Sequence, residues 1–171
     1  MAVTSLQIER LRCLHGIDFH PDPNLNLITG ANAAGKTSLL ESIFLLSRGR
    51  SFRSGRNSEM IQYEASTLTV SAKINDDAVP HRLGIEIAPG GRRLQLDGEA
   101  AAIGDLAALL PVQVIDPEVH LLIQGGPEQR RRFLDWGVFH VEPQFLDCWR
   151  RYRKALRQRN AALRRQEPRE V

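Results

Sequence analysis

Eight residues near the N-terminus have the types and the spacing of a phosphate-binding loop. Residues 30–37 read G-x-x-x-x-G-K-T, which is a complete P-loop pattern. Small residues in such a loop let backbone N–H groups point at phosphate oxygens. The lysine reaches the β- and γ-phosphates, and the threonine hydroxyl can bind Mg²⁺. The predicted phosphate site consists of Gly30, Ala31, Asn32, Ala33, Ala34, Gly35, Lys36 and Thr37, with Thr37 as the Mg²⁺ ligand.

The residues on either side of this loop fit the same interpretation. Leu25, Leu27 and Ile28 predict a short strand over residues 25–29. Apolar residues at helical spacing predict a helix over residues 36–46, whose positive N-terminal end would face the phosphates. A chance match in a Gly/Ala-rich turn would rarely come with both a strand and a helix. We therefore expect phosphate binding.

The bulk composition describes a chain with a core and an uneven charge. The 171 residues suit one domain, or one and part of a second, and 42% are apolar. Residues 1–127 carry 11 Lys/Arg and 14 Asp/Glu, whereas residues 128–171 carry 12 and 6, so basic charge gathers toward the C-terminal end. Two distant cysteines, Cys13 and Cys148, predict free thiols. No signal peptide or long apolar run is recognisable, so we expect a cytoplasmic protein without a membrane segment.

The remaining pattern predicts an α/β head. We expect strands over residues 4–12 and 17–19, and two strands before a P-loop are usual for ATPase heads of the ABC and SMC type. Alternating apolar residues predict an antiparallel meander over residues 67–74, 82–88 and 92–96. A helix is expected over residues 104–110. We predict a mixed sheet with this meander as one layer, an ATP-binding head core over residues 1–125, and the beginning of a helical lobe over residues 126–171.

An apolar run that ends in an acidic residue raises a second possibility for the chemistry. Residues 112–116 predict a strand ending at Asp116, and Glu118 follows Pro117. As a Walker B segment, Asp116 would bind near Mg²⁺ and Glu118 would act as a base. Gln113 interrupts the apolar run and Pro117 separates the acids, which argues against it. Otherwise Pro117 begins a helix over residues 117–123.

Two groups of arginines are candidates for contact with nucleic acid. Arg50 and Arg53 lie in an arginine-rich loop after the P-loop helix, and Arg130, Arg131 and Arg132 open a predicted helix. Solvated surface residues are the alternative for both groups. A last helix, expected over residues 142–166, carries a narrow apolar stripe among many arginines and calls for a second helix to cover it. We therefore expect the chain to be a shortened one.

These motifs together resemble the RecF family, whose members are related to SMC-type ATPases. The resemblance covers essentially the whole chain, and its most specific parts are the block around residues 131–136 and the closing residues 159–161. The other matching stretches are residues 6–14, 30–43, 49–53, 116–118, 126–127 and the rest of residues 156–163. It implies a head that binds ATP and forms a homodimer around it, and that binds single-stranded or gapped DNA. It further implies action with RecO and RecR to place RecA on gapped DNA, in replication, repair and the SOS response.

The sequence also departs from that family in ways that matter. Ala33 stands where RecF-like loops usually have glycine, and it would strain the loop if the position needs a positive φ. The resemblance aligns residues 112–116 with a segment other than Walker B, and the family's Walker B and signature motifs have no match in the chain. Whether the chain hydrolyses ATP is therefore left open. The alternatives are a self-sufficient small P-loop NTPase that uses Asp116 and Glu118, and a nucleotide- and DNA-binding module without turnover.

Overall fold

The computed structural model describes residues 2–76 and 79–165, and these fall into two compact units. The first unit is Met1–Val114 and the second is Ile115–Val171. Their division falls before the domain boundary that we predict at residue 125. A compact unit is defined by contacts alone, so the assignment of residues 1–125 and 126–171 to a head core and a helical lobe stays a prediction.

The first unit is built on a six-stranded sheet with the order β2-β1-β3-β4-β5-β6. The strands are β1 (Ala2–Glu9), β2 (Ile17–Phe19), β3 (Leu68–Asp76), β4 (Val79–Ala88), β5 (Gly91–Leu96) and β6 (Glu99–Ala100). Every pairing in this sheet is antiparallel. The α/β fold class and the predicted antiparallel meander are confirmed, whereas the sheet expected to be mixed is antiparallel at every pairing in the described residues. The short β6 was not predicted, because two residues carry no readable pattern.

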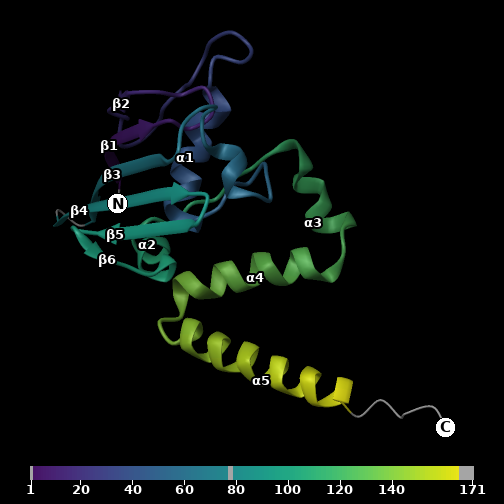
Figure 1. Ribbon diagram of the computed structural model, residues 1–171. Coiled ribbons are helices and arrows are strands. Elements are labelled where there is room, and N and C mark those ends of the chain that lie inside the picture. Colours follow the sequence, from purple (N-terminus) through teal and green to yellow (C-terminus); the bar gives the residue numbers. More distant parts are fainter. Residues whose placement is uncertain (1, 77–78, 166–171) are drawn as a thin grey trace. The chain divides into compact units, whose positions relative to one another are not determined.

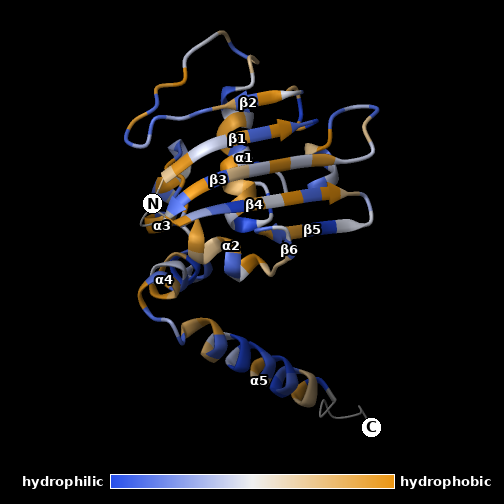
Figure 2. Ribbon diagram, turned by 90° about the vertical axis from the view of Figure 1, so that its left-hand side faces the viewer, coloured by the Kyte–Doolittle hydropathy of each residue, from blue (hydrophilic) through white to orange (hydrophobic). Residues whose placement is uncertain are grey.

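One face of the sheet forms the core, because apolar residues alternate along the strands. Figure 2 shows this alternation along β3 and β4. The inward residues include Leu6 and Ile8 of β1, Val70 of β3 and Ile85 of β4, all of which are buried. Helix α1 (Lys36–Arg48) packs against β3 and β4 and covers this face (Figure 1). Helix α2 (Ile103–Leu109) and the 3-10 turn η1 (Asn57–Met60) complete the layer.

Two predicted strands do not form in this structure. Residues 25–29 and residues 112–116 have no regular secondary structure. The side chains of Leu25 and Leu27 are 83% and 87% exposed, and Ile115 is 82% exposed. A strand requires a neighbour to accept and donate its hydrogen bonds. Within the described residues neither segment has such a neighbour, so apolar alternation alone did not suffice.

The second unit is helical. It contains the 3-10 turn η2 (Pro117–His120) and the helices α3 (Leu121–Gln124), α4 (Pro127–Val141) and α5 (Phe145–Arg165). The indole N–H of Trp149 in α5 donates to the carboxylate of Asp135 in α4 over 3.2 Å, which ties these two helices together. Along α5 the predicted stripe remains partly open, with Tyr152 62% and Leu163 49% exposed. Among the helices that the structure describes, none is long and apolar enough to cross a bilayer.

Candidate nucleotide-binding site

The loop before α1 turns sharply, with three residues in backbone conformations that favour glycine. Gly30, Ala33 and Gly35 have φ angles of 149°, 66° and 94°, in the region that favours glycine. A side chain at Gly35 would also place its Cβ 2.6 Å from a methyl group of Leu14. Gly35 is therefore favoured first by its backbone angle, and a Cβ there would also displace the Leu14 methyl group. The sequence-based concern about Ala33 is confirmed, because this alanine sits in the left-handed region.

The first turn of α1 keeps backbone N–H groups open toward the loop. Gly35 is the N-cap and no side chain caps the helix there, so the positive end of the helix dipole is available to an anion. The ammonium group of Lys36 folds back over the loop and donates to the carbonyl oxygens of Gly30 at 2.8 Å and of Ala31 at 2.7 Å. These contacts hold a positive charge over the same turn.

A cavity of about 430 Å³ opens at this loop. The P-loop contributes residues 32–38 to its lining, and the rest comes from Arg12, Cys13 and Arg53. Arg12 follows β1, and Arg53 belongs to the segment after α1. Three cationic side chains, Lys36, Arg12 and Arg53, thus border one hollow. Such a hollow suits a polyanion of nucleotide size.

Glu41 ties the two arginines to α1. Its side chain is fully buried, and both its oxygens accept from Arg12: the Nε–Oε2 distance is 2.6 Å and the Nη2–Oε1 distance is 2.9 Å. The hydroxyl of Ser51 donates to Oε1 as well. Arg53 approaches Oε2 with Nη1 at 3.8 Å, which is an ion pair without a hydrogen bond. Glu41 was not predicted from the sequence, because its partners are distant in sequence.

The charge state of this cluster follows from two opposing effects. Burial raises the pKa of Glu41, but hydrogen bonds from Arg12 and Ser51 and the charges of Arg12 and Arg53 outweigh it and lower that pKa below its ordinary value. The hydrogen bond to Glu41 raises the pKa of Arg12. Glu41 is therefore a buried carboxylate, and Arg12 is its full counter-ion. Arg53 adds a positive charge that the carboxylate does not fully compensate.

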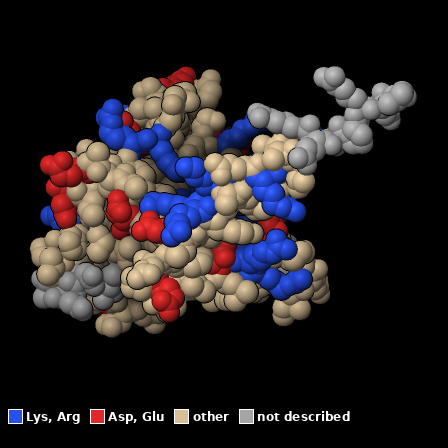
Figure 3. Space-filling view, turned by 90° about the horizontal axis from the view of Figure 1, so that it is seen from below, with Lys and Arg blue, Asp and Glu red and all other residues tan. Residues whose placement is uncertain are grey.

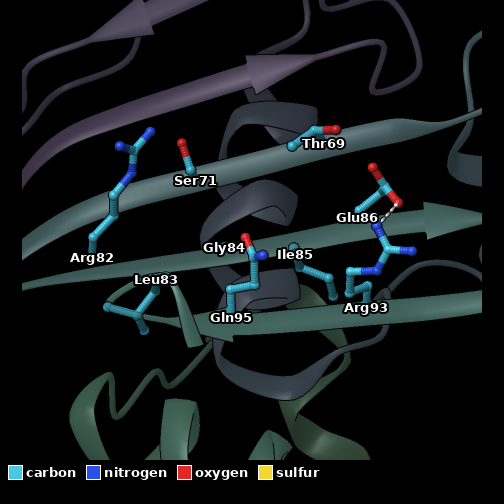
Figure 4. Close-up of a pocket in the computed structure, with 10 residues that line it drawn as sticks. Thr69, Ser71, Arg82, Leu83, Gly84, Ile85, Glu86, Arg93 and Gln95 are labelled. Atoms are coloured by element: carbon cyan, nitrogen blue, oxygen red, sulfur yellow. Dashed lines mark ion pairs between the residues drawn. The ribbon is translucent and has the colours of Figure 1, made fainter. Parts of the chain in front are cut away.

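A second hollow of about 440 Å³ lies on the opposite face of the same sheet. Figure 4 shows Ser71 of β3, Gly84 of β4 and Gln95 of β5 at this face, with α1 behind the sheet. Arg93 pairs with Glu86 across it at 3.5 Å. Neither the P-loop nor a helix N-terminus contributes to its lining. The hollow at the P-loop is consequently the stronger candidate for a nucleotide.

The structure distinguishes among the arginines predicted to meet DNA. Arg50 is exposed, whereas Arg53 borders the P-loop cavity. Arg130 donates to the carbonyl oxygens of Ile123 and Gly125, and Arg132 pairs with Glu128 one turn earlier in α4. Arg131 is exposed and makes no ion pair within residues 2–76 and 79–165. Exposed Lys and Arg side chains are visible as blue groups in Figure 3.

The two Walker B candidates belong to the second unit, which begins at Ile115. Asp116 is its second residue, and the side chain of Glu118 lies outside the described residues, so the Walker B interpretation stays a prediction. No group of His, Cys, Asp and Glu that could hold a metal occurs in the described part of the chain. Both Cys13 and Cys148 are free thiols, as predicted.

Comparison with known proteins identifies relatives along nearly the whole chain. Residues 5–100 match the family described as AAA domain. "DNA replication and repair protein RecF" of Pseudomonas fluorescens SBW25 is 46% identical over 167 residues, which cover 96% of this chain and 46% of the relative. The protein of the same name from Pseudomonas putida is 44% identical over 166 residues, with the same coverages. The chain thus spans about half the length of the curated relatives that it matches.

A solved structure supports the same relationship. "Structure of the recombination mediator protein RecF-ATP in RecFOR pathway" superposes with a TM-score of 0.86 at 26% identity. The superposition covers 99% of this chain and 47% of that chain. A second structure of the same mediator, titled as a complex with ATPrS, gives a TM-score of 0.82 at 27% identity. Sequence and structure therefore select the N-terminal half of the same relatives.

Proposed function

We propose that residues 30–37 bind Mg²⁺-ATP, because this chain belongs to the RecF family of AAA-domain proteins and corresponds to its N-terminal half. The observation that carries the proposal is the uncapped N-terminus of α1, which opens into the cavity beside Lys36. Solved structures of RecF with ATP and of RecF with ATPrS share this fold at TM-scores of 0.86 and 0.82. Backbone amides, the helix dipole and a lysine together supply what a triphosphate needs.

The roles of individual residues follow from the chemistry of the loop. Lys36 would exchange its two carbonyl partners for β- and γ-phosphate oxygens, since its ammonium group already lies over the turn. The hydroxyl of Thr37, exposed at the start of α1, fits a Mg²⁺ ligand. Bound Mg²⁺ would neutralise phosphate charge. Neither Asp116 nor Glu118 is required for binding, and hydrolysis by this chain alone is not part of the proposal.

Thermal unfolding with and without Mg²⁺-ATP tests the site. We expect ATP at about 100 times its dissociation constant to stabilise the chain by roughly 2.7 kcal/mol. Lys36→Ala should abolish this stabilisation. Lys73→Ala is the matched control, because Lys73 is an exposed lysine on β3, outside the P-loop cavity. A folded, unmutated chain that gains nothing from Mg²⁺-ATP would contradict the proposal.

We propose further that the whole protein acts as a cytoplasmic recombination mediator. In this role it would form an ATP-dependent homodimer, bind single-stranded or gapped DNA, and act with RecO and RecR to load RecA during replication, repair and the SOS response. Support comes from the names of the relatives, which describe DNA replication and repair and a recombination mediator in the RecFOR pathway. The excess of basic residues after residue 127 suits contact with phosphates.

The arginines of α4 provide a test of DNA contact. Arg131 is the best candidate of the three, since Arg130 and Arg132 are engaged inside the helical unit. We expect Arg131→Gln to weaken DNA binding and to lower the slope of log affinity against log salt by about 1. Arg132→Gln, whose side chain already pairs with Glu128, serves as the comparison and should change the slope less. Equal effects of the two changes would remove the distinction.

A further inference from the structure

The two arginines at the P-loop cavity are held to Glu41 with unequal strength. Arg12 makes two charge-assisted hydrogen bonds to the buried carboxylate, at 2.6 and 2.9 Å, and its side chain is 23% exposed. Arg53 stands 3.8 Å away, beyond hydrogen-bond distance, and its side chain is 44% exposed. Arg12 is therefore fixed in the wall of the cavity, whereas the guanidinium of Arg53 can leave Glu41 at little cost.

The backbone that carries Arg53 is fixed independently of its guanidinium. Ser51 is buried and donates its hydroxyl proton to Glu41, while the same oxygen accepts from the backbone N–H groups of Arg53 at 2.8 Å and Ser54 at 3.0 Å. Glu41 thus holds the turn at residues 51–54 through Ser51. The consequence is a rigid base under Arg53 and a side chain that is free to turn.

A bound polyphosphate would compete with Glu41 for this side chain. Glu41 is a single carboxylate whose lone pairs already accept from Arg12 and Ser51. A phosphate in the cavity would offer several unshared oxygens and a larger negative charge. Arginine also matches the geometry of phosphate with two parallel N–H groups. The guanidinium of Arg53 gains more from the phosphate than it loses at 3.8 Å from Glu41.

We infer that Glu41 is a positioning residue of the nucleotide site: it fixes Arg12 in the cavity wall and, through Ser51, aims Arg53 so that its guanidinium moves from Glu41 to a bound phosphate. This inference rests on the proposed ATP site and adds to it a part that lies outside the P-loop motif. It also reassigns Arg53, which the sequence suggested as a DNA contact, to the nucleotide. Arg50, which is exposed and does not line the cavity, keeps its place as a DNA candidate.

The test compares Mg²⁺-ATP affinity and thermal midpoint in a small set of variants. Arg53→Gln removes the guanidinium, and Arg53→Lys keeps the charge. Arg56→Gln is the matched control, since Arg56 is an exposed arginine in the same segment but does not line the cavity. Ser51→Ala and Glu41→Gln remove the two parts of the positioning device. Ser51→Ala keeps the inference testable if Glu41→Gln proves unfolded.

We expect Arg53→Gln to weaken Mg²⁺-ATP affinity about tenfold, as loss of one charge-assisted hydrogen bond predicts. Its thermal midpoint should stay near that of the unmutated chain. Arg53→Lys should recover part of the affinity, and Arg56→Gln should bind normally. Ser51→Ala should weaken binding too, and the Ser51→Ala/Arg53→Gln double variant should bind no more weakly than Arg53→Gln alone. Folded Glu41→Gln should weaken binding at least as much as Ser51→Ala, because it also releases Arg12 from the cavity wall.

Contrary results separate this inference from the ATP site itself. Normal binding by Arg53→Gln, or an equal loss in Arg56→Gln, would overturn the role of Arg53. Fully additive losses in the double variant would overturn positioning through Glu41 and Ser51. In both cases, binding by the unmutated chain would leave the P-loop proposal intact. Failure of the unmutated chain to bind Mg²⁺-ATP would instead overturn both.

Discussion

The two compact units differ in that the first contains a buried ion pair between distant segments. In the first unit, the carboxylate of Glu41 is fully buried and contacts Arg12, Ser51 and Arg53, which are distant from it in sequence. Two of these partners, Arg12 and Arg53, line the P-loop cavity. In the second unit, ion pairs join close neighbours on exposed helix surfaces, as between Arg132 and Glu128, whose side chains are 63% and 73% exposed. A buried pair between distant segments fixes a site, whereas an exposed pair within one helix turn fixes very little.

This difference also explains why the units differ in how well function can be located. The first unit has a cavity with a recognised motif, a helix N-terminus and three cations. The second has basic residues spread along α4 and α5, and any of several could face DNA. Net charge indicates the class of partner but does not select contacts. The structure makes an arginine a weaker candidate for DNA contact only where that arginine already binds another group in the same unit, as Arg130 and Arg132 do.

The largest test of the contrast compares one arginine from each unit. Arg12→Gln leaves a buried carboxylate without its main counter-ion, and we expect a loss of about 3 kcal/mol in the free energy of unfolding. Arg132→Gln removes an exposed pair within α4 and should cost under about 0.5 kcal/mol. Urea unfolding, followed by circular dichroism, measures both. Similar small losses would show that burial of Glu41 does not distinguish the two regions.

Acid unfolding offers a second and smaller test of the same cluster. Because the folded-state pKa of Glu41 lies below its ordinary value of 4.5, its contribution to stability is complete above that value. It is lost as the pH falls through the lowered pKa, when the carboxylate takes up a proton. Glu41→Gln should therefore be less stable near neutral pH and should lose less additional stability on acidification. Asp22 and Asp97, whose pKa values are also lowered, should leave a residual slope.

Parallel acid titrations of the unmutated chain and Glu41→Gln, with unfolding free energies at each pH, provide the measurement. The difference between the two proteins should shrink below about pH 4.5. A difference that stays constant down to low pH would mean that folding does not shift the pKa of Glu41.

Much of the first unit could be predicted from local sequence, and the failures have a common cause. The P-loop and the helix after it were readable because they are contiguous in sequence, and β2 was predicted to begin at Ile17, where it does begin. The strands expected over residues 25–29 and 112–116 were wrong, since pairing depends on a neighbour that local alternation does not specify. Sequence reasoning can name strand-forming residues without naming their partners.

The same limit applies to the site. Residues 30–37 were predicted, but Glu41 was not, although it lies in the same helix. The role of Glu41 depends on its contacts with Arg12, which lies 29 positions earlier, and with Ser51, which lies 10 positions later. An acidic residue among the apolar residues of a predicted helix was the available signal, because a charge in that setting requires a partner. The motif predicted a phosphate-binding loop, and the tertiary contacts identify the side chains that lie beside that loop.

The smallest expected effect concerns the P-loop itself, at Ala33. Ala33 has a φ of 66°, and a left-handed conformation costs a residue with a side chain about 1–2 kcal/mol. Glycine removes that strain but loses more entropy on folding, by about 0.4–1 kcal/mol. Ala33→Gly should therefore stabilise the chain by about 0.5 kcal/mol, measured by urea unfolding. Gly35→Ala, which adds both strain and a contact at 2.6 Å to Leu14, should destabilise it. A destabilising Ala33→Gly would mean that strain in this loop is compensated by contacts of the alanine methyl group.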